Sequence, residues 1–192
     1  LFGTSRIATG EVELNGQQLT VLGPADAINR GIVFLTADRK QEGLVMDMSI
    51  YDNLSLVALK RFVNVFGYVR TREERKVAAE FNKQVQVKSR SPFAAVRNLS
   101  GGDQQKVVFG KWMMTEPYVC MMEDPTRGVD IGAKSEMYRL MNQLTAKGIS
   151  IIVVSSDIPE LVAMSDRVLV LHEGRAVKQL EGDDITQHNI LH

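Results

Sequence analysis

Residues 99–106 read LSGGDQQK and place a serine and two glycines directly before a segment with helical periodicity. In that segment Val108 and Trp112 are four positions apart, and Phe109 and Met113 repeat the spacing, which predicts an amphipathic helix. Its first turn would present unpaired backbone N–H groups and the positive end of the helix dipole. Two glycines would let an anion approach that backbone, so the pattern predicts a phosphate site. An ordinary serine cap followed by a turn is the alternative interpretation.

Composition sets loose bounds on the class of protein. With 192 residues, 44% of them hydrophobic, the chain can bury a real core. Its 23 basic and 23 acidic residues cancel, which argues against an overall attraction to nucleic acid or to an anionic bilayer. Cys120 is the single cysteine, lies in an apolar run, and suits a reducing compartment as a small buried residue. The apolar runs are much shorter than the ~20 residues that a membrane-spanning helix needs.

The first half of the chain predicts a small sheet and then a helical insertion. Residues 10–14 and 18–22 flank Asn15-Gly16, the dipeptide that favours a type I′ β-hairpin. A short helix over 26–30 and a buried strand over 31–35 follow. Residues 43–98 have a helical pattern. It comprises one helix from about 49 to 60 and another from 71 to about 84, which opens on a capping box of Thr71 and Glu74.

The second half alternates strands and helices, which is typical of a parallel α/β sheet. Residues 118–122 and 149–154 predict buried strands, and Asp130 is expected to cap the helix between them. A short helix with Pro159 in its first turn comes next. Strands over 167–171 and 175–180, and a helical tail, complete the predicted elements.

Two carboxylates follow the first of these strands. Glu123 and Asp124 stand where a buried strand would end, and adjacent acids beside a phosphate site can hold Mg²⁺ and orient a water molecule. Two solvated acids at a junction between strand and loop are the other interpretation.

Several of these segments together resemble ATP-binding-cassette (ABC) ATPases, in particular those of monosaccharide importers. LSGGDQQK resembles the signature motif, and residues 122–130 resemble the Walker B and D-loop segment. Residues 38–44 (DRKQEGL), 125–134 (PTRGVDIGAK) and 155–161 (SSDIPEL) are further matches. The most similar proteins are expected to be the C-terminal cassettes of fused two-cassette subunits for ribose-type, galactose or pentose uptake.

The resemblance implies a fold class and a division of the chain. The expected class is α/β, the parallel-sheet core of a P-loop NTPase of the ABC type with a helical subdomain, and truncated at its N-terminus. Residues 1–42 would form the first part of the core, 43–98 the helical subdomain, and 99–192 the core with the signature, Walker B, D-loop and switch regions.

The resemblance also implies roles for individual residues. Asp124 and Glu123 would be catalytic: Asp124 would polarise the attacking water, and Glu123 would lie on the side of the magnesium ion. The residues implied to bind ATP are Ser100, Gly101, Gly102, Gln104, Asp130 and Ser156. ATP and Mg²⁺ are the implied cofactors.

Departures from the family pattern affect the chain's own nucleotide site. The sequence contains no Gly-x-x-x-x-Gly-Lys-Ser/Thr, the loop that holds the β- and γ-phosphates. Ala37 stands at the position of the Q-loop glutamine, and Ser156 at that of the switch histidine. Glu123 and Asp124 are transposed, and a carboxylate displaced by about 1 Å can lower a rate on the order of 10²-fold. The expectation is a cassette that completes a partner's ATP site and is degenerate at its own.

The resemblance further implies partners and a location. A second cassette, either fused or in a homodimer, and transmembrane permease subunits would assemble with the chain. A sugar-binding protein would act indirectly, and nucleic acid would not be a partner. The chain would lie at the cytoplasmic face of the inner (plasma) membrane, without selecting the sugar. A non-hydrolysing structural or regulatory cassette, and a soluble ABC ATPase without a transport role, are the alternative functions.

Overall fold

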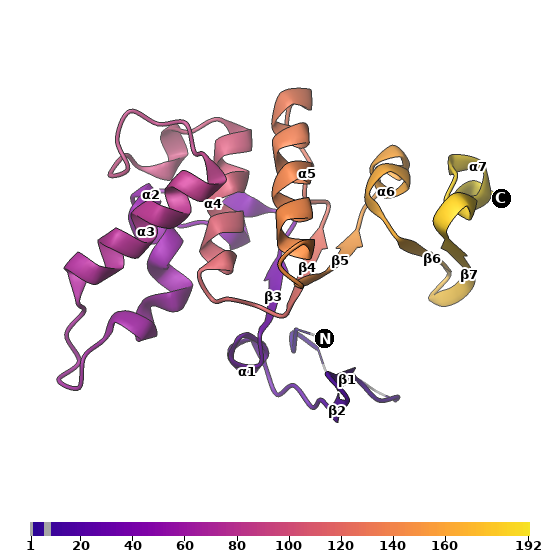
Figure 1. Cartoon of the computed structure of the whole chain (residues 1–192), viewed down its shortest axis with the longest axis horizontal. Coiled ribbons are helices and arrows are strands. Elements are labelled where there is room, and N and C mark those ends of the chain that lie inside the picture. Colours follow the sequence, from indigo (N-terminus) through magenta and orange to yellow (C-terminus); the bar gives the residue numbers. More distant parts are fainter. Residues whose placement is uncertain (1, 6–8) are drawn as a thin grey trace. The chain divides into compact units, whose positions relative to one another are not determined.

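The computed structural model describes residues 2–5 and 9–192. The chain forms two compact units, Leu1–Val153 and Val154–His192, and each is described by itself. Figure 1 shows the elements in chain order. This division falls at a different place from the predicted boundaries near residues 42 and 98, which stay a prediction. Among the described residues, the helices are all too short or too polar to cross a bilayer.

The first unit begins with the predicted hairpin. Strands β1 (Glu13–Leu14) and β2 (Gln17–Gln18) are antiparallel, and Asn15 and Gly16 between them both have positive φ angles. The turn is confirmed, although the strands are much shorter than the sequence predicts. Helix α1 (Pro24–Asn29) follows.

A three-stranded sheet lies at the centre of the first unit. Its order is β3 (Ile32–Leu35), β4 (Val119–Glu123) and β5 (Ser150–Val154). Strands β3 and β4 are parallel, with Leu35 paired to Met122. Because parallel strands end at the same edge of a sheet, the turn after β3 and the acids at the end of β4, Glu123 and Asp124, lie at one edge.

The helical segment differs from the sequence prediction in two details. The single helix expected over 49–60 is α2 (Ile50–Ser55) followed by the 3₁₀ helix η2 (Leu56–Phe62). The helix changes from α to 3₁₀ geometry at Leu56, directly after Ser55, whose hydroxyl oxygen lies 3.2 Å from the carbonyl oxygen of Tyr51.

The predicted capping box on α3 (Thr71–Val85) is wrong. The Glu74 carboxylate does not turn back to the start of its own helix. It accepts a hydrogen bond from Ser55 of α2 at 2.5 Å, while the Thr71 hydroxyl donates to the Val69 carbonyl oxygen. A tertiary contact has replaced the local cap.

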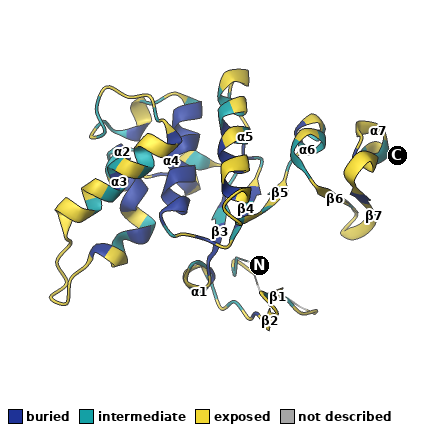
Figure 2. Ribbon diagram, viewed as in Figure 1, coloured by how far each residue is buried: buried dark blue, intermediate teal, exposed yellow. Residues whose placement is uncertain are grey.

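Two long helices carry the motifs. They are α4 (Gly101–Met113), preceded by the 3₁₀ turn η3 (Val96–Asn98), and α5 (Ile131–Thr145). Helix α5 buries one apolar face, formed by Met137, Leu140, Met141 and Leu144. Helix α4 forms over the predicted segment, and its polar side is buried as well as its apolar side, because α2, α3, α5, β3 and the π-helical turn η1 (Arg39–Gly43) all pack against it. Figure 2 shows α4 buried along almost its whole length.

The second unit has a small core of its own. It contains α6 (Ile158–Met164), the antiparallel pair β6 (Arg167–His172) and β7 (Arg175–Glu181), the turn η4 (Gly182–Asp184) and α7 (Gln187–Leu191). Glu173 and Gly174 form the connecting turn with positive φ angles. Val168, Leu180 and Ile185 form its core. The order of a short helix, two strands and a helical tail confirms the prediction.

Candidate functional site

The start of α4 is built by Ser100. Its hydroxyl accepts a hydrogen bond from the backbone N–H of Asp103 at 3.2 Å and donates to the Asp103 carboxylate at 2.7 Å. This reciprocal cap fixes the first helical turn. Ser100 is exposed, Gly101 is half-buried and Gly102 is buried. Ser100 and Gly101 therefore remain accessible at the helix end, where the dipole is positive.

The two glycines allow close packing within the chain itself. A Cβ atom on Gly101 would lie 2.8 Å from the guanidinium of Arg39, and one on Gly102 would lie 2.5 Å from the Cβ of Ala133. Real Cβ contacts are not that short. At Gly101 the flexible end of the Arg39 side chain could move aside, but at Gly102 a larger residue would push α4 away from α5. Gly102 is thus required for helix packing, a reason that the sequence interpretation did not include.

Arg39 is a site residue that the sequence interpretation missed. It follows β3, in a turn whose cap is the Asp38 carboxylate accepting from the N–H groups of residues 40 and 41. Its Nη1 donates to the carbonyl oxygen of Arg127 at 3.1 Å, and its Nε to Gln104 Oε1 at 3.4 Å. One guanidinium therefore joins α4 to the loop after β4. The sequence signal for Arg39 is its place in residues 38–44 (DRKQEGL), which resemble the family pattern but give no role to this side chain.

Gln104 is only 4% exposed, and its amide is used inside the fold. The amide nitrogen donates to the carbonyl oxygens of Val96 and Leu99 at 3.2 and 3.3 Å, while the amide oxygen accepts from Arg39. In the structure Gln104 therefore fixes the segment before α4, residues 96–99, and Arg39 relative to the first turn of the helix. A contact of this side chain with ATP stays a prediction.

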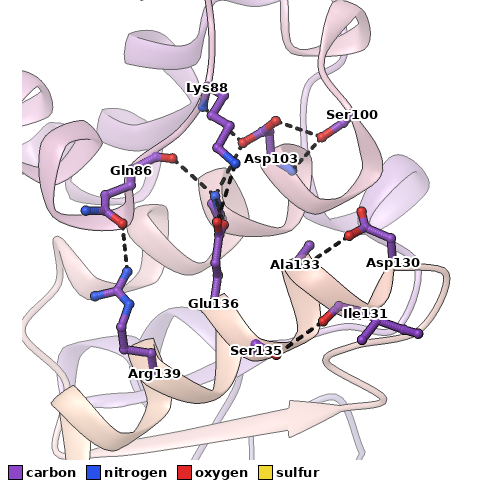
Figure 3. Close-up of polar contacts among 11 residues, drawn as sticks. Gln86, Lys88, Ser100, Asp103, Asp130, Ile131, Ala133, Ser135, Glu136 and Arg139 are labelled. Atoms are coloured by element: carbon purple, nitrogen blue, oxygen red, sulfur yellow. Dashed lines mark hydrogen bonds and ion pairs between the residues drawn. The ribbon is translucent and has the colours of Figure 1, made fainter.

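A buried lysine lies two residues further along α4, and Figure 3 labels the three residues that it contacts, Gln86, Asp103 and Glu136. Lys106 is only 2% exposed, and its ammonium donates to the carbonyl oxygen of Gln86 at 3.1 Å. It also pairs with Glu136 of α5, and with Asp103 at 3.5 Å. The charge is compensated by partners from α4, α5 and the segment after α3, as a buried ammonium requires.

The lysine pair also sets the electrostatics of Glu136. Hydrogen bonding to Lys106, together with the charges of Lys106 and Lys88, lowers the pKa of the Glu136 carboxyl below its usual value. Lys88 contributes a second contact, 3.5 Å from the same carboxylate, and its own backbone N–H donates to Asp103 at 3.0 Å. The network fixes α4 relative to α5, and hence the signature relative to the loop that precedes α5.

Asp130 forms the matching cap on α5. Its carboxylate accepts from the backbone N–H of Ala133 at 3.0 Å, which confirms the predicted cap. Asp130 is exposed. Since Ala133 packs on Gly102, the capped start of α5 lies beside the first turn of α4, so the structure brings Asp130 and the signature together.

The paired acids lie at the end of β4. Glu123 is the last residue of the strand and is exposed, whereas Asp124 is half-buried and has a φ of 40°, a left-handed conformation. That conformation turns the chain abruptly, and the carbonyl oxygen of Asp124 accepts from the N–H of Arg127 at 2.9 Å. Ala37 lies at the same sheet edge, after β3, and offers no side-chain donor or acceptor.

The fit to Mg²⁺ can be judged from these side chains. Among residues 2–5 and 9–192, no group of three acidic, histidine or cysteine side chains could enclose a metal ion. Mg²⁺ in nucleotide sites commonly uses one or two carboxylates and takes its other ligands from phosphates and water. Glu123 therefore fits such an ion only as a partial ligand, beside a bound nucleotide.

Ser156 belongs to the second unit and is exposed directly before α6. Asp157 caps that helix by accepting from the N–H of Glu160 at 3.3 Å, and the Ser155 hydroxyl donates to the Glu160 carboxylate at 2.7 Å. These contacts fix the local conformation around Ser156. They leave its predicted contact with a γ-phosphate as a prediction.

Two other titratable groups are perturbed by burial. Lys111 on α4 donates to the carbonyl oxygen of Gly43, and desolvation lowers its pKa to about 8. Burial raises the pKa of the Cys120 thiol to about 12, so this cysteine is unreactive near neutral pH, as predicted for a small buried residue.

Residues 1–127 match the ABC transporter family, and the chain belongs to that family. The chain is 44% identical over 191 residues to the ribose import ATP-binding protein RbsA of Oceanobacillus iheyensis. It is 41% identical over 191 residues to the protein of the same name from Geobacillus kaustophilus. Each alignment covers 100% of this chain and 38% of the relative, so the chain spans less than two-fifths of their length.

Solved structures show the same fold. The ADP conformation of an ATP-binding cassette of an ABC transporter superposes with a TM-score of 0.81, covering 98% of this chain and 76% of that one, at 20% identity. A dimeric cassette in a post-hydrolysis state, bound to ADP and phosphate, gives a TM-score of 0.72 at 21% identity, with coverage of 91% and 74%. These likenesses confirm the predicted α/β cassette fold with its helical segment.

Proposed function

We propose that this chain is part of the ATP-binding component of an ABC importer that energises monosaccharide uptake. The relatives with 41–44% identity over the chain are ribose import ATP-binding proteins, which supports a sugar of that class. The work of this chain would be to supply its signature to a composite ATP site whose phosphate-binding loop belongs to a second cassette. Transmembrane permease subunits would complete the assembly at the cytoplasmic face of the membrane.

The accessible start of α4 is the observation that carries this proposal. Ser100 caps the helix and is exposed, and Gly101 presents its backbone without a side chain. The helix dipole favours a negatively charged group at this end. Behind it, Arg39 bonds to Gln104 and Lys106 pairs with Glu136, contacts that fix the first turns of α4 to neighbouring segments. Asp130, beside the same turn, would couple the two ATP sites of the pair.

The chain's own catalytic chemistry would be weak. A bound Mg²⁺ would neutralise charge on the transferring phosphoryl group, with Glu123 as a partial ligand. Asp124 would polarise the attacking water, but it is shorter than glutamate and is held by a left-handed backbone. Ser156 would contact the γ-phosphate through its hydroxyl and would add no positive charge.

A long, positively charged side chain at the N-terminus of α4 tests the composite ATP site. Ser100→Arg would be made in a subunit of the relatives' full length that carries this chain, assembled with its permease. We expect ATP turnover and sugar uptake to fall together, because the long side chain fills the phosphate position. Ser89→Arg, at an exposed loop serine, is the matched control. Unchanged turnover in the Ser100 variant would refute the proposal.

A non-hydrolysing cassette is the second candidate, and Ala37 and the transposed acids support it. Replacing Asp124 by Asn in the same subunit separates the two functions. If this half hydrolyses ATP, turnover falls further than in a control variant such as Asp166→Asn. If Asp124→Asn leaves ATP turnover unchanged while Ser100→Arg still abolishes sugar uptake, the chain acts only by closing on a partner's ATP.

A further inference from the structure

The connection between η2 and α3 carries the most exposed apolar side chains of the helical segment. Val63 and Val69 form an isolated antiparallel bridge, and residues 63–69, here called the aromatic hairpin, turn back between them. Val65, Phe66 and Tyr68 are 94%, 81% and 74% exposed. Figure 2 shows the whole loop as exposed, and Figure 1 shows it extending away from the helices of its unit.

This hairpin is an ordered turn. The Asn64 side-chain oxygen accepts from the backbone N–H groups of Phe66 and Tyr68 at 2.9 and 3.0 Å. The N–H of Asn64 donates to the carbonyl oxygen of Tyr68 at 2.9 Å, and the N–H of Gly67 to that of Asn64 at 3.0 Å. Four hydrogen bonds thus hold three large side chains outside any core. Such a preformed apolar tip indicates an interaction surface.

Basic residues flank the tip on both sides. Residues 60–76 contain six basic residues and two acidic ones, Glu73 and Glu74, a local net charge of +4 (6 − 2). The basic residues nearest the tip are Lys60, Arg61, Arg70 and Arg72. Arg61 pairs with Glu116 at 3.0 Å and Arg70 with Glu73 at 2.6 Å, both at the surface, where such pairs are weak. The zero net charge of the whole chain conceals this local excess.

We propose that the aromatic hairpin docks on an anionic lipid surface. Aromatic side chains with a polar atom, such as Tyr68, favour the headgroup level, and lysine and arginine are attracted to acidic headgroups. A permease loop is the competing occupant, but cytoplasmic loops of membrane proteins are enriched in lysine and arginine. Those loops would repel the basic flanks, so charge complementarity selects the lipid.

This proposal rests on the proposed function in one respect, that the chain works close to a membrane. Its test uses no nucleotide and is independent of the ATP site. The full chain would be floated with vesicles of phosphatidylcholine alone or with a quarter of phosphatidylglycerol. We expect binding to the anionic vesicles only, weakening as salt rises. Phe66→Ser should reduce the partition coefficient roughly tenfold through lost apolar burial, and Arg72→Glu roughly tenfold or more through charge reversal.

Matched controls keep the test sharp. Leu22→Ser removes an apolar side chain that is 87% exposed elsewhere, and Arg175→Glu reverses an exposed charge in the second unit. Both should bind as the unmodified chain does. Equal binding to neutral vesicles, no binding to anionic ones, or an unaffected Phe66→Ser variant would overturn the proposal. So would loss of permease association in that variant without any vesicle binding, which would assign the hairpin to a protein. Each of these results would leave the composite ATP site untouched.

Discussion

Helix α4 and the aromatic hairpin reverse the usual distribution of polar and apolar residues. Helix α4 buries a lysine at 2% exposure, whereas the hairpin exposes a phenylalanine at 81%. Lys106 can be buried because three elements supply its partners. Phe66 can be exposed because the backbone of its turn is bonded locally and needs no core. The comparison shows that long-range partners are needed to bury a charge, whereas local hydrogen bonds are enough to order an exposed apolar turn.

The largest effect is expected from removing the buried ammonium. Lys106→Met would leave Asp103, Glu136 and the Gln86 carbonyl oxygen without their shared donor. Breaking a fully buried pair costs about 3–5 kcal/mol. Because the Glu136 side chain is 32% exposed, the loss is expected at the lower end of that range, as a lower free energy of unfolding in urea. Lys88→Met, at an exposed lysine that contacts the same carboxylate, should cost less than about 1 kcal/mol. Equal losses would mean that burial of Lys106 is not what matters.

The contact between α4 and α5 should give the next largest effect. Gly102→Ala places a methyl group where Ala133 already lies, and overpacking of this kind costs about 1–3 kcal/mol. Ala133→Gly in the same chain should restore part of the loss, which a double-mutant cycle in urea would measure. Additive losses would show that the two residues do not compete for one space.

The acid titration of Glu136 should give a smaller effect, confined to a narrow pH range. Its pKa is lowered in the folded state, so its contribution is present above its unfolded value of 4.5 and is lost as pH falls through the folded value. The gap in urea midpoint between the unmodified chain and Glu136→Gln should therefore be full at pH 7 and shrink below about pH 4.5. A gap that is constant down to pH 3 would contradict the ion pair.

The smallest effect on stability is expected at the hairpin. Phe66→Ser should change the free energy of unfolding by no more than about 0.5 kcal/mol, because the ring contacts solvent. Thermal unfolding of both chains checks this expectation. A larger loss would mean that the ring packs within the fold, and the contrast with α4 would then disappear.

Local signals in the sequence predicted much of this structure. Asn15-Gly16, Ser100 and Asp130 each encode a turn or cap that depends on neighbouring residues alone, and each is confirmed. The Thr71 and Glu74 cap failed because Ser55, distant in sequence, provides a competing partner.

The support of the candidate site could not be predicted in the same way. Arg39 reaches Arg127 across 88 positions, and Lys106 reaches its partners on two other elements. Periodicity predicted α4 as an amphipathic helix but could not predict that its polar side is buried, since it does not report what packs against a helix. The exposure of residues 63–69 likewise depends on their lying outside the packed helices.

The central claim is tested most directly by asking whether a nucleotide protects position 100, at the N-terminus of α4, from chemical labelling. Ser100→Cys would be made in a subunit of the relatives' full length that carries this chain, with any cysteines outside the chain replaced; Cys120 is buried and unreactive. The account predicts that a non-hydrolysable ATP analogue with Mg²⁺ slows maleimide labelling of the thiol at position 100, while Ser89→Cys labels at an unchanged rate. Equal labelling rates at position 100 with and without the nucleotide would contradict it.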